Sequence, residues 1–371
     1  YLGLTSAGAK VLPYIPHREK EGYGLSKQGL EFARDSGASL VITTDTGIVS
    51  FDMADYAKEL GLDLIVTDHH QEQGSKRPDA FAIVHSIKLC GAAVTWALVK
   101  TLITKQADED LLDLVAIATV SDMMPLLGIN RCLVINGLEK LNQTKRVGLL
   151  ALFRQADLEI GKIGSYEIGH VIAPRLNAMG RLEHAIDSLR LLCTKDPVKA
   201  RKLADLVAET NEQRKVLTKE AVDEARLMIN GPSKKIHILS SEKWVPGIIG
   251  LIAGRVCDET GCTAVAISIS GELSKGSARS GNGVNIIEVL RECSDLLVAV
   301  GGHEGAAGFT IETSKIDEFS KRLEKLTDDV VVNEESVLEI EAEVESRAIS
   351  LGLAKSLDDF EPFGVGNPKP I

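Results

Sequence analysis

The chain has 371 residues, of which 44% are hydrophobic, and it carries a formal net charge of −11 at pH 7. This length allows two domains with sizeable cores, and no apolar run approaches the roughly 18 residues of a transmembrane helix, so a membrane role is not expected. The acidic balance argues against a general polyanion binder, because sequence-independent affinity for nucleic acids comes from clustered Lys and Arg. It does not exclude a nucleic-acid enzyme, since carboxylates that hold divalent cations add to the acidic count.

The first 120 residues alternate between helical and strand patterns. Two helical segments, each closed by a glycine, lead into apolar strands, and a buried helix follows. These elements are helix 31–36, strand 40–43, helix 51–60, strand 62–66 and helix 91–104. Their order predicts an α/β fold with a doubly wound parallel sheet.

The strongest functional signal follows the second predicted strand. Thr67-Asp68-His69-His70 comes directly after the apolar run 62–66. A carboxylate and two imidazoles at the carboxyl end of a buried strand can bind a metal ion, which indicates metal-assisted phosphate chemistry. One such triplet is weak evidence alone, because a histidine pair is more often a surface feature or a satisfied core feature.

Two further carboxylates occur in the same local pattern. The β-branched run 41–44 ends in Asp45, and the apolar run 114–120, interpreted as another strand, ends in Ser121-Asp122. Because the carboxyl ends of neighbouring parallel strands meet at one crevice, we expect Asp45, His69 and Asp122 to be metal ligands. Alone, Asp45 also fits a turn residue and Asp122 a helix N-cap or turn, but the recurrence at three predicted strand ends favours the metal site.

The remainder of the chain predicts a helical region, a connector and a second α/β unit. Residues 130–195 are mostly helical, and the charged stretch 196–230 has apolar positions at helical spacing. The second unit is expected to contain strands 236–239 and 264–269, helices 247–257 and 284–297, a half-exposed strand at 337–345 and a turn at 364–368.

Two segments of the second unit suggest a phosphate pocket. The small residues of Gly301 to Phe309 allow close backbone approach to a ligand, with His303 among them, although a packed strand and turn is the alternative. In the segment Lys275 to Ser280, Arg279 is flanked by hydroxyls and is suited to bind phosphate oxygens, unless this is an exposed polar turn.

Two segments of the first half leave their interpretation open. Ala173 to Leu182 places two arginines and an amide around a glycine break, either for phosphate or for pairing with acidic neighbours. His17 to Gly24 is a loop that either contacts a nucleic-acid backbone or is solvated.

Several of these segments resemble the DHH phosphoesterase superfamily with its DHHA1 domain. They are Asp68-His69-His70, Ala118 to Leu126, and Gly301-Gly302-His303 with Ala306-Ala307-Gly308. Others are similar to its RecJ branch of single-strand-specific 5′ to 3′ DNA exonucleases: Pro16-His17-Arg18 with Glu21 to Gly24, Ala173 to Ala178, Trp244 to Gly250, and Pro362 to Pro368. The match runs in order across almost the whole chain.

The resemblance implies two divalent ions, Mn²⁺ or Mg²⁺, in the first domain, acting by a two-metal mechanism. Carried over motif by motif, the metal ligands are Asp45, His69 and Asp122. His70 is then expected to orient or stabilise the scissile phosphate, and Asp68 to support the ligand shell.

The resemblance also implies single-stranded DNA as the substrate, admitted into a cleft between two lobes that excludes a duplex. The residues expected to contact it are Arg175, Asn177, Arg181, Ser277, Arg279, Gly301, Gly302 and His303. Of these, Ser277, Arg279, His303 and one of Arg175 and Arg181 are expected to bind the terminal 5′ phosphate, which fixes polarity. A monomer suits such an enzyme, whereas the sequence does not decide the cellular metal, DNA or RNA preference, or partnership with a single-strand-binding protein or a helicase.

The expected domains follow the same resemblance. They are a DHH domain at 1–195, a connecting helix at 196–230, a DHHA1 domain at 231–328 and the start of an OB-type region at 329–371. The family begins with an Asp-x-Asp strand, and none precedes Tyr1, so we expect the full-length protein to supply it. The opening at Tyr1 without a methionine is in keeping with an internal piece of a longer chain.

The cysteines agree with a cytoplasmic protein. The six are scattered without a Cys-x-x-Cys pair, at Cys90, Cys132, Cys193, Cys257, Cys262 and Cys293, so neither a zinc knuckle nor a disulfide framework is expected. The predicted function is a metal-dependent exonuclease of DNA repair and recombination. The alternatives are a phosphodiesterase of short oligonucleotides or nucleotide phosphates, and a catalytically inactive scaffold of replication.

Overall fold

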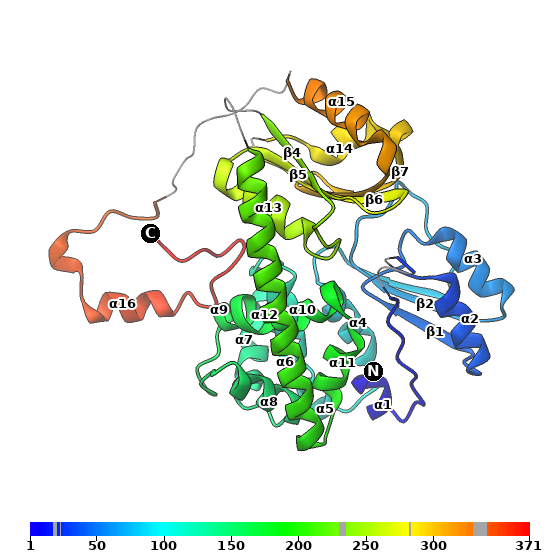
Figure 1. The fold of residues 1–371 in the computed structure, drawn as a ribbon. Helices are drawn as coiled ribbons and strands as arrows, with labels where there is room; N and C mark the ends of the chain where they lie inside the picture. Colours follow the sequence, from blue (N-terminus) through cyan, green and yellow to red (C-terminus); the bar gives the residue numbers. More distant parts are fainter. Residues whose placement is uncertain (18–20, 23, 230–234, 282, 329–339) are drawn as a thin grey trace. The chain divides into compact units, whose positions relative to one another are not determined.

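The computed structural model describes residues 1–371 except 18–20, 23, 230–234, 282 and 329–339, and it divides into two compact units (Figure 1). The first unit comprises Tyr1–Glu209 and Glu339–Ile371, and the second comprises Thr210–Leu338. The 32-residue helix α12 (Pro197–Met228) begins in the first unit and ends in the second. In the part of the chain that is described, no helix is long and apolar enough to span a bilayer.

The first unit is built on a small parallel sheet. Its three strands, in the order β1-β2-β3, are β1 (Leu40–Thr44), β2 (Asp63–Asp68) and β3 (Ala82–His85). Helices α2 (Lys27–Asp35) and α3 (Phe51–Glu59) pack on one face against Leu64 and Val66. The other face meets α4 (Gly91–Val99), where the hydroxyls of Thr67 and Thr95 lie 2.8 Å apart.

Helices make up most of the rest of the first unit. They are α1 (Leu2–Ser6), α5 (Lys105–Glu109), α6 (Leu112–Ser121), α7 (Gly128–Asn142), α8 (Val147–Gln155), α9 (Ser165–Glu167), the π-helix η1 (Ile168–Ile172), α10 (Ala173–Leu182), α11 (Ile186–Cys193), the 3₁₀ turn η4 (Ser346–Ala348) and α16 (Leu351–Asp358). Helices α6, α7, α8, α10 and α11 share one hydrophobic core, in which Leu149, Leu152 and Phe153 of α8 are fully buried.

The second unit is a mixed five-stranded sheet between helices. Its strand order is β4-β5-β6-β8-β7, and only β4 and β5 are parallel. The strands are β4 (Ile236–Ser241), β5 (Thr263–Ser268), β6 (Leu273–Arg279), β7 (Leu297–His303) and β8 (Ala306–Glu312). The helices are α13 (Ile249–Thr260), α14 (Ile286–Arg291) and α15 (Ile316–Asp328), with the 3₁₀ turns η2 (Ser294–Leu296) and η3 (Thr313–Lys315). Side chains of α14 and α15 share one core with Ala278, Ala307 and Phe309.

The structure corrects four of the predicted elements. The run 114–120 is not a strand but lies in α6, because an unbroken apolar run fits a helix buried on several sides as well as it fits a buried strand. The predicted helix 284–297 is interrupted after Arg291, since η2 follows α14. Of the predicted strand 337–345, residues 337–339 lie outside the described residues and 340–345 contain no strand. Gly180 does not break the helix that contains it.

Candidate active site

Asp45 follows β1 in an unusual backbone conformation. Its φ of 62° is left-handed, which is uncommon for a residue other than glycine and is retained mainly at turns and functional sites. Its amide donates to the carbonyl of Thr67 on β2, and the hydroxyl of Thr43 donates to the carbonyl of Thr46. These bonds fix the turn, and with it the position of the Asp45 carboxylate.

The three predicted metal ligands meet at this end of the sheet. Nε2 of His69 lies 3.0 Å from Oδ1 of Asp45 and 3.5 Å from Oδ2 of Asp122. A nitrogen of His70 also falls in the group, because ligand atoms of Asp45, His69 and His70 all lie within 4.8 Å of one another. The structure therefore brings Asp45, His69 and Asp122 together although one of them follows a helix rather than a strand.

Asp122 occupies the C-terminal cap of α6. Its amide donates to Ala118 at the end of the helix, and Met123 then takes a left-handed φ of 54°. Burial raises the pKa of the Asp122 carboxyl, and Asp45 acts in the same direction while His69 opposes it. In turn, the carboxylate of Asp45 raises the pKa of His69. Two carboxylates this close to one histidine, those of Asp45 and Asp122, repel each other, and a bound cation would stabilise them.

Asp68 holds the second histidine. Its side chain is only 1% exposed, and it accepts bonds from the amides of Ile48, His69 and His70 and lies 2.7 Å from Nδ1 of His70. Burial alone would raise the pKa of Asp68, but the bonds from His70 and Ile48 lower it to about 2. An ionised Asp68 therefore fixes the His70 ring through Nδ1. Nε2 is then the ring nitrogen that points away from Asp68.

The donor set at this site fits a hard divalent cation. Carboxylate oxygens with imidazole are ligands that Mn²⁺ accepts, and Oδ1 of Asp45 is a buried oxygen with Nε2 of His69 3.0 Å away. Gly91 provides the space, since a Cβ there would lie 2.4 Å from Oδ1 of Asp45. Asp45, His69 and Asp122 would hold the ion.

In the second unit, the predicted phosphate ligands share one face of the sheet. Across β8, Ser277 pairs with Gly308, which pairs with Gly301, and the next row is Arg279, Ala306 and His303. Because side chains alternate along a strand, residues two apart lie on the same face. Lys275 to Ser280 is thus mostly strand, which excludes an exposed polar turn, while Gly301 to Phe309 is a strand, turn and strand.

Arg279 is a half-buried cation at the amino end of α13. Its Nη1 donates to Ser277 Oγ and to the carbonyl of Ala278, and no ion pair to it occurs among the described residues. Burial lowers its pKa, as expected for a charge without a carboxylate partner. A Cβ on Gly250 would lie 3.2 Å from both Arg279 Nη2 and Ser277 Oγ. A helix amino terminus beside arginine and hydroxyl donors attracts anions.

The three residues of α10 that are predicted to contact DNA do not lie on one side of the helix. At about 100° per residue, Asn177 and Arg181 share a helix face and Arg175 lies well round from it. Nη1 of Arg175 donates to the carbonyl of Val171, one turn earlier. Gly302 has a structural role in addition, because its φ is 147° and a Cβ there would strike Ala306 O at 2.3 Å.

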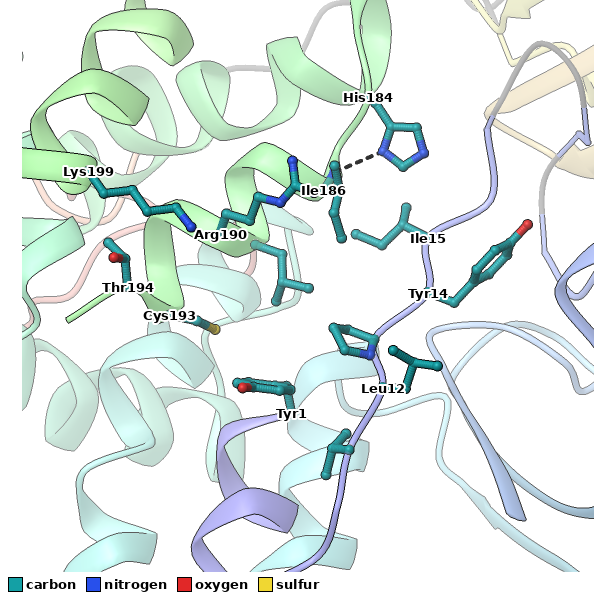
Figure 2. Close-up of a pocket in the computed structure, with 13 residues that line it drawn as sticks. Tyr1, Leu12, Tyr14, Ile15, His184, Ile186, Arg190, Cys193, Thr194 and Lys199 are labelled. Carbon is teal, nitrogen blue, oxygen red and sulfur yellow. Dashed lines mark hydrogen bonds between the residues drawn. The ribbon is translucent and has the colours of Figure 1, made fainter. Parts of the chain in front are cut away.

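The first unit also contains a cavity of about 580 Å³, which is separate from the group formed by Asp45, His69 and Asp122 (Figure 2). None of the predicted site residues lines it. Its walls include Tyr1, Tyr14, His184, Arg190 and Cys193.

Comparison with known proteins identifies both domains. The DHH family, N-terminal domain, matches residues 1–119, and the DHHA1 domain matches residues 233–329. The single-stranded-DNA-specific exonuclease RecJ of Bacillus subtilis is 37% identical to the chain and aligns with 99% of it and 48% of the relative. The RecJ of Salmonella typhimurium is 30% identical, with 100% of this chain and 70% of the relative covered. The chain belongs to the RecJ family.

The RecJ fold extends over the chain. The crystal structure of RecJ in complex with Mn²⁺ from Thermus thermophilus superposes with a TM-score of 0.84 at 29% identity, covering 99% of this chain and 55% of that one. A second RecJ structure from that organism was solved with Mg²⁺. The chain spans about half the length of several RecJ relatives that it matches.

Sequence patterns did not single out two glycines that lie against candidate site residues, Gly91 beside Asp45 and Gly250 beside Arg279. At each position a side chain from a distant part of the sequence packs against the glycine. The residues that adjoin each glycine in the sequence give no indication of that contact. Gly250 did lie within a segment similar to RecJ, which was the available hint.

Proposed function

We propose that this chain is the catalytic core of a metal-dependent exonuclease that hydrolyses single-stranded DNA from its 5′ end, in DNA repair and recombination. The observation that carries the proposal is the meeting of the Asp45 and Asp122 carboxylates at Nε2 of His69, at 3.0 and 3.5 Å. Membership of the RecJ family supports the substrate class.

The metal is Mn²⁺ or Mg²⁺, held by Asp45, His69 and Asp122. When bound, the ion lowers the pKa of water and stabilises charge on phosphoryl oxygens. The contribution of the chain itself is positional. Asp68 is held by backbone amides and fixes the His70 ring through Nδ1, so that Nε2 of His70 contacts a non-bridging oxygen of the scissile phosphate.

The face formed by Ser277, Arg279 and His303 binds the terminal 5′ phosphate. Its support is the half-buried Arg279, which forms no ion pair with a carboxylate of the described residues and lies beside the amino end of α13. Holding one end of the strand gives the enzyme its polarity. Asn177 and Arg181 contact the strand from their shared helix face, and Arg175 contributes indirectly through the turn at Val171.

The division of the chain follows from the same proposal. Residues 1–195 form the DHH domain, 196–230 the connecting helix, 231–328 the DHHA1 domain and 329–371 the start of an OB-type region. The enzyme acts as a monomer.

The test uses full-length protein, Mn²⁺ and single-stranded DNA labelled at its 3′ end, with either a 5′ phosphate or a 5′ hydroxyl. Stepwise shortening is expected, faster for the phosphate, and lost in Asp122→Ala but retained in the exposed control Asp55→Ala. Cleavage of dinucleotides or nucleotide phosphates without shortening of DNA would assign the small-substrate activity instead. Inactivity on all of these substrates would contradict both and favour a scaffold.

A further inference from the structure

Residues Phe360–Asn367 of the first unit form a closed turn, called here the 360–367 turn. Backbone hydrogen bonds run both ways between Gly364 and Asn367, at 2.9 and 3.1 Å. The side-chain amide of Asn367 donates to the carbonyls of Phe360 and Pro362, both at 2.9 Å. Gly366 has a left-handed φ of 73°, which glycine adopts without strain. The turn is thus a defined structure rather than an extended tail.

Arg131 on α7 binds this turn through its main chain. The guanidinium donates to the carbonyls of Phe360 and Glu361, both at 2.7 Å, and to that of Pro362 at 3.5 Å. Among the residues that the structure describes, no carboxylate forms an ion pair with Arg131. A planar fork bound to three successive carbonyls fixes the orientation of the segment as well as its distance.

The other side of the turn contacts the loop between α6 and α7. The amide of Leu126 donates to the carbonyl of Val365 at 2.7 Å, and Leu126 is only 1% exposed. A Cβ on Gly364 would lie 2.7 Å from Leu126 Cδ1, and one on Gly366 would lie 3.3 Å from Pro125 Cβ. The two glycines therefore let the turn pack directly on this loop.

The loop held in this way is the one that begins at the metal ligand Asp122. Three residues separate Asp122 from Leu126. The first end of the loop is fixed by the amide of Met124, which donates to Thr119 in the last turn of α6. The second end is fixed by the 360–367 turn, and by Asn130, whose side-chain amide donates to the carbonyl of Pro125 at 3.1 Å.

We propose that the 360–367 turn and Arg131 are positioning elements for Asp122 that set its carboxylate for the divalent ion, although the turn lies more than 230 positions away from Asp122 in sequence. The 360–367 turn and the loop after Asp122 are far apart in the sequence, so only these tertiary contacts connect them. This inference rests on the proposed function, since it takes Asp122 as a metal ligand. Neither Arg131 nor Asn367 touches the reacting atoms, so each acts through the loop alone.

The test measures Mn²⁺ binding to full-length protein by titration, independently of catalysis. Arg131→Ala and the milder Asn367→Ala are expected to weaken Mn²⁺ affinity by about tenfold, at the lower end of losses from groups that support metal ligands. Arg154→Ala, an exposed arginine on α8, is the matched control and should bind Mn²⁺ like the wild type. In the Asp122→Ala background, Arg131→Ala should cause no further loss, because the residue acts through Asp122.

Two results would overturn the inference. One is an unchanged Mn²⁺ affinity in both variants together with a lower thermal midpoint, which would make the turn a structural support only. The other is additive losses of affinity in the double variant, which would separate Arg131 from Asp122. A wild type that binds no Mn²⁺ would instead contradict the proposed function. Amide exchange of the metal-free protein gives a further readout, since the amides of Met124, Leu126 and Leu127 should exchange faster in Arg131→Ala.

Discussion

The two candidate sites of this chain are built in opposite ways. Around Asp45 and Asp122, acidic side chains and two histidines lie close together, and one of the histidines, His70, is held by the buried carboxylate of Asp68. Around Arg279, most of the neighbouring strand residues are glycine and alanine, with His303 in the same row, and no carboxylate of the described residues forms an ion pair with Arg279. The first site concentrates negative charge for a cation, whereas the second leaves room and positive charge for an anion.

This contrast implies different kinds of sensitivity to mutation. At the acidic site, each residue positions another, so a single change is expected to reduce catalysis. At the basic face, the contacts are few and separable, so changes are expected to alter substrate affinity and leave the catalytic step intact.

The largest expected effect is that of His69→Ala. This variant should lose Mn²⁺-dependent hydrolysis of single-stranded DNA by about 1000-fold or more, because the metal supplies several kcal/mol of transition-state stabilisation. His170→Ala removes an exposed ring that stacks on Tyr166, and it should retain activity. Equal activity of the two variants in a nucleotide-release assay would refute the assignment of His69.

Asp68→Asn should have the next largest effect, with a fall in kcat of about 10- to 100-fold. The amide cannot supply a carboxylate to His70, so the ring is less firmly held. The matched control is Asp63→Asn, at the exposed end of the same strand. If single-turnover rates of the two variants coincide, Asp68 does not position His70.

Arg279→Met tests whether the basic face acts on binding. KM for DNA with a 5′ phosphate should rise about tenfold with little change in kcat, through loss of charge-assisted hydrogen bonds. The thermal midpoint should stay constant or rise, because a half-buried charge without a carboxylate is removed. Arg255→Met, an exposed residue on α13 paired with Glu259, is the control for KM. A fall in kcat with an unchanged KM in Arg279→Met would contradict the assignment of the basic face to substrate binding.

The smallest expected effect is that of Gly250→Ala, compared with Gly254→Ala in the same helix. A methyl group at position 250 meets Arg279 and Ser277 at 3.2 Å and should raise KM by about two- to fivefold, as expected for a small displacement of binding groups. Position 254 has nothing within 4 Å, so alanine there should increase the free energy of unfolding by up to about 1 kcal/mol. Identical KM values for the two variants would show that Arg279 and Ser277 accommodate the methyl group at position 250 without losing substrate affinity.

Local patterns in the sequence predicted much of this architecture because they report neighbours along the chain. The alternation of helix and strand located β1 and β2, and the polar residues after them located Asp45 and His69. Asp122 does lie beside His69, but at the end of a helix rather than the predicted strand, since a short apolar run cannot distinguish a buried strand from a buried helix.

Contacts between distant segments could not be predicted in the same way. Arg131 gives no sign in the sequence that it binds main-chain carbonyls more than 200 residues later. Likewise, the helical spacing that separates Arg175 from Asn177 and Arg181 becomes visible only when the segment is known to be continuous helix. Their roles, with those of the other proposed site residues, remain predictions for mutagenesis.

The approach of Gly91 to Asp45 has an evolutionary consequence. Helix α4 begins so near the carboxylate that any side chain at position 91 would require Asp45 to move. The two positions should therefore covary among relatives: glycine is retained wherever the aspartate is retained, and larger residues appear at position 91 only in sequences where the aspartate has been lost. Loss of this glycine in a relative would then be a simple marker of a paralogue that has given up its metal.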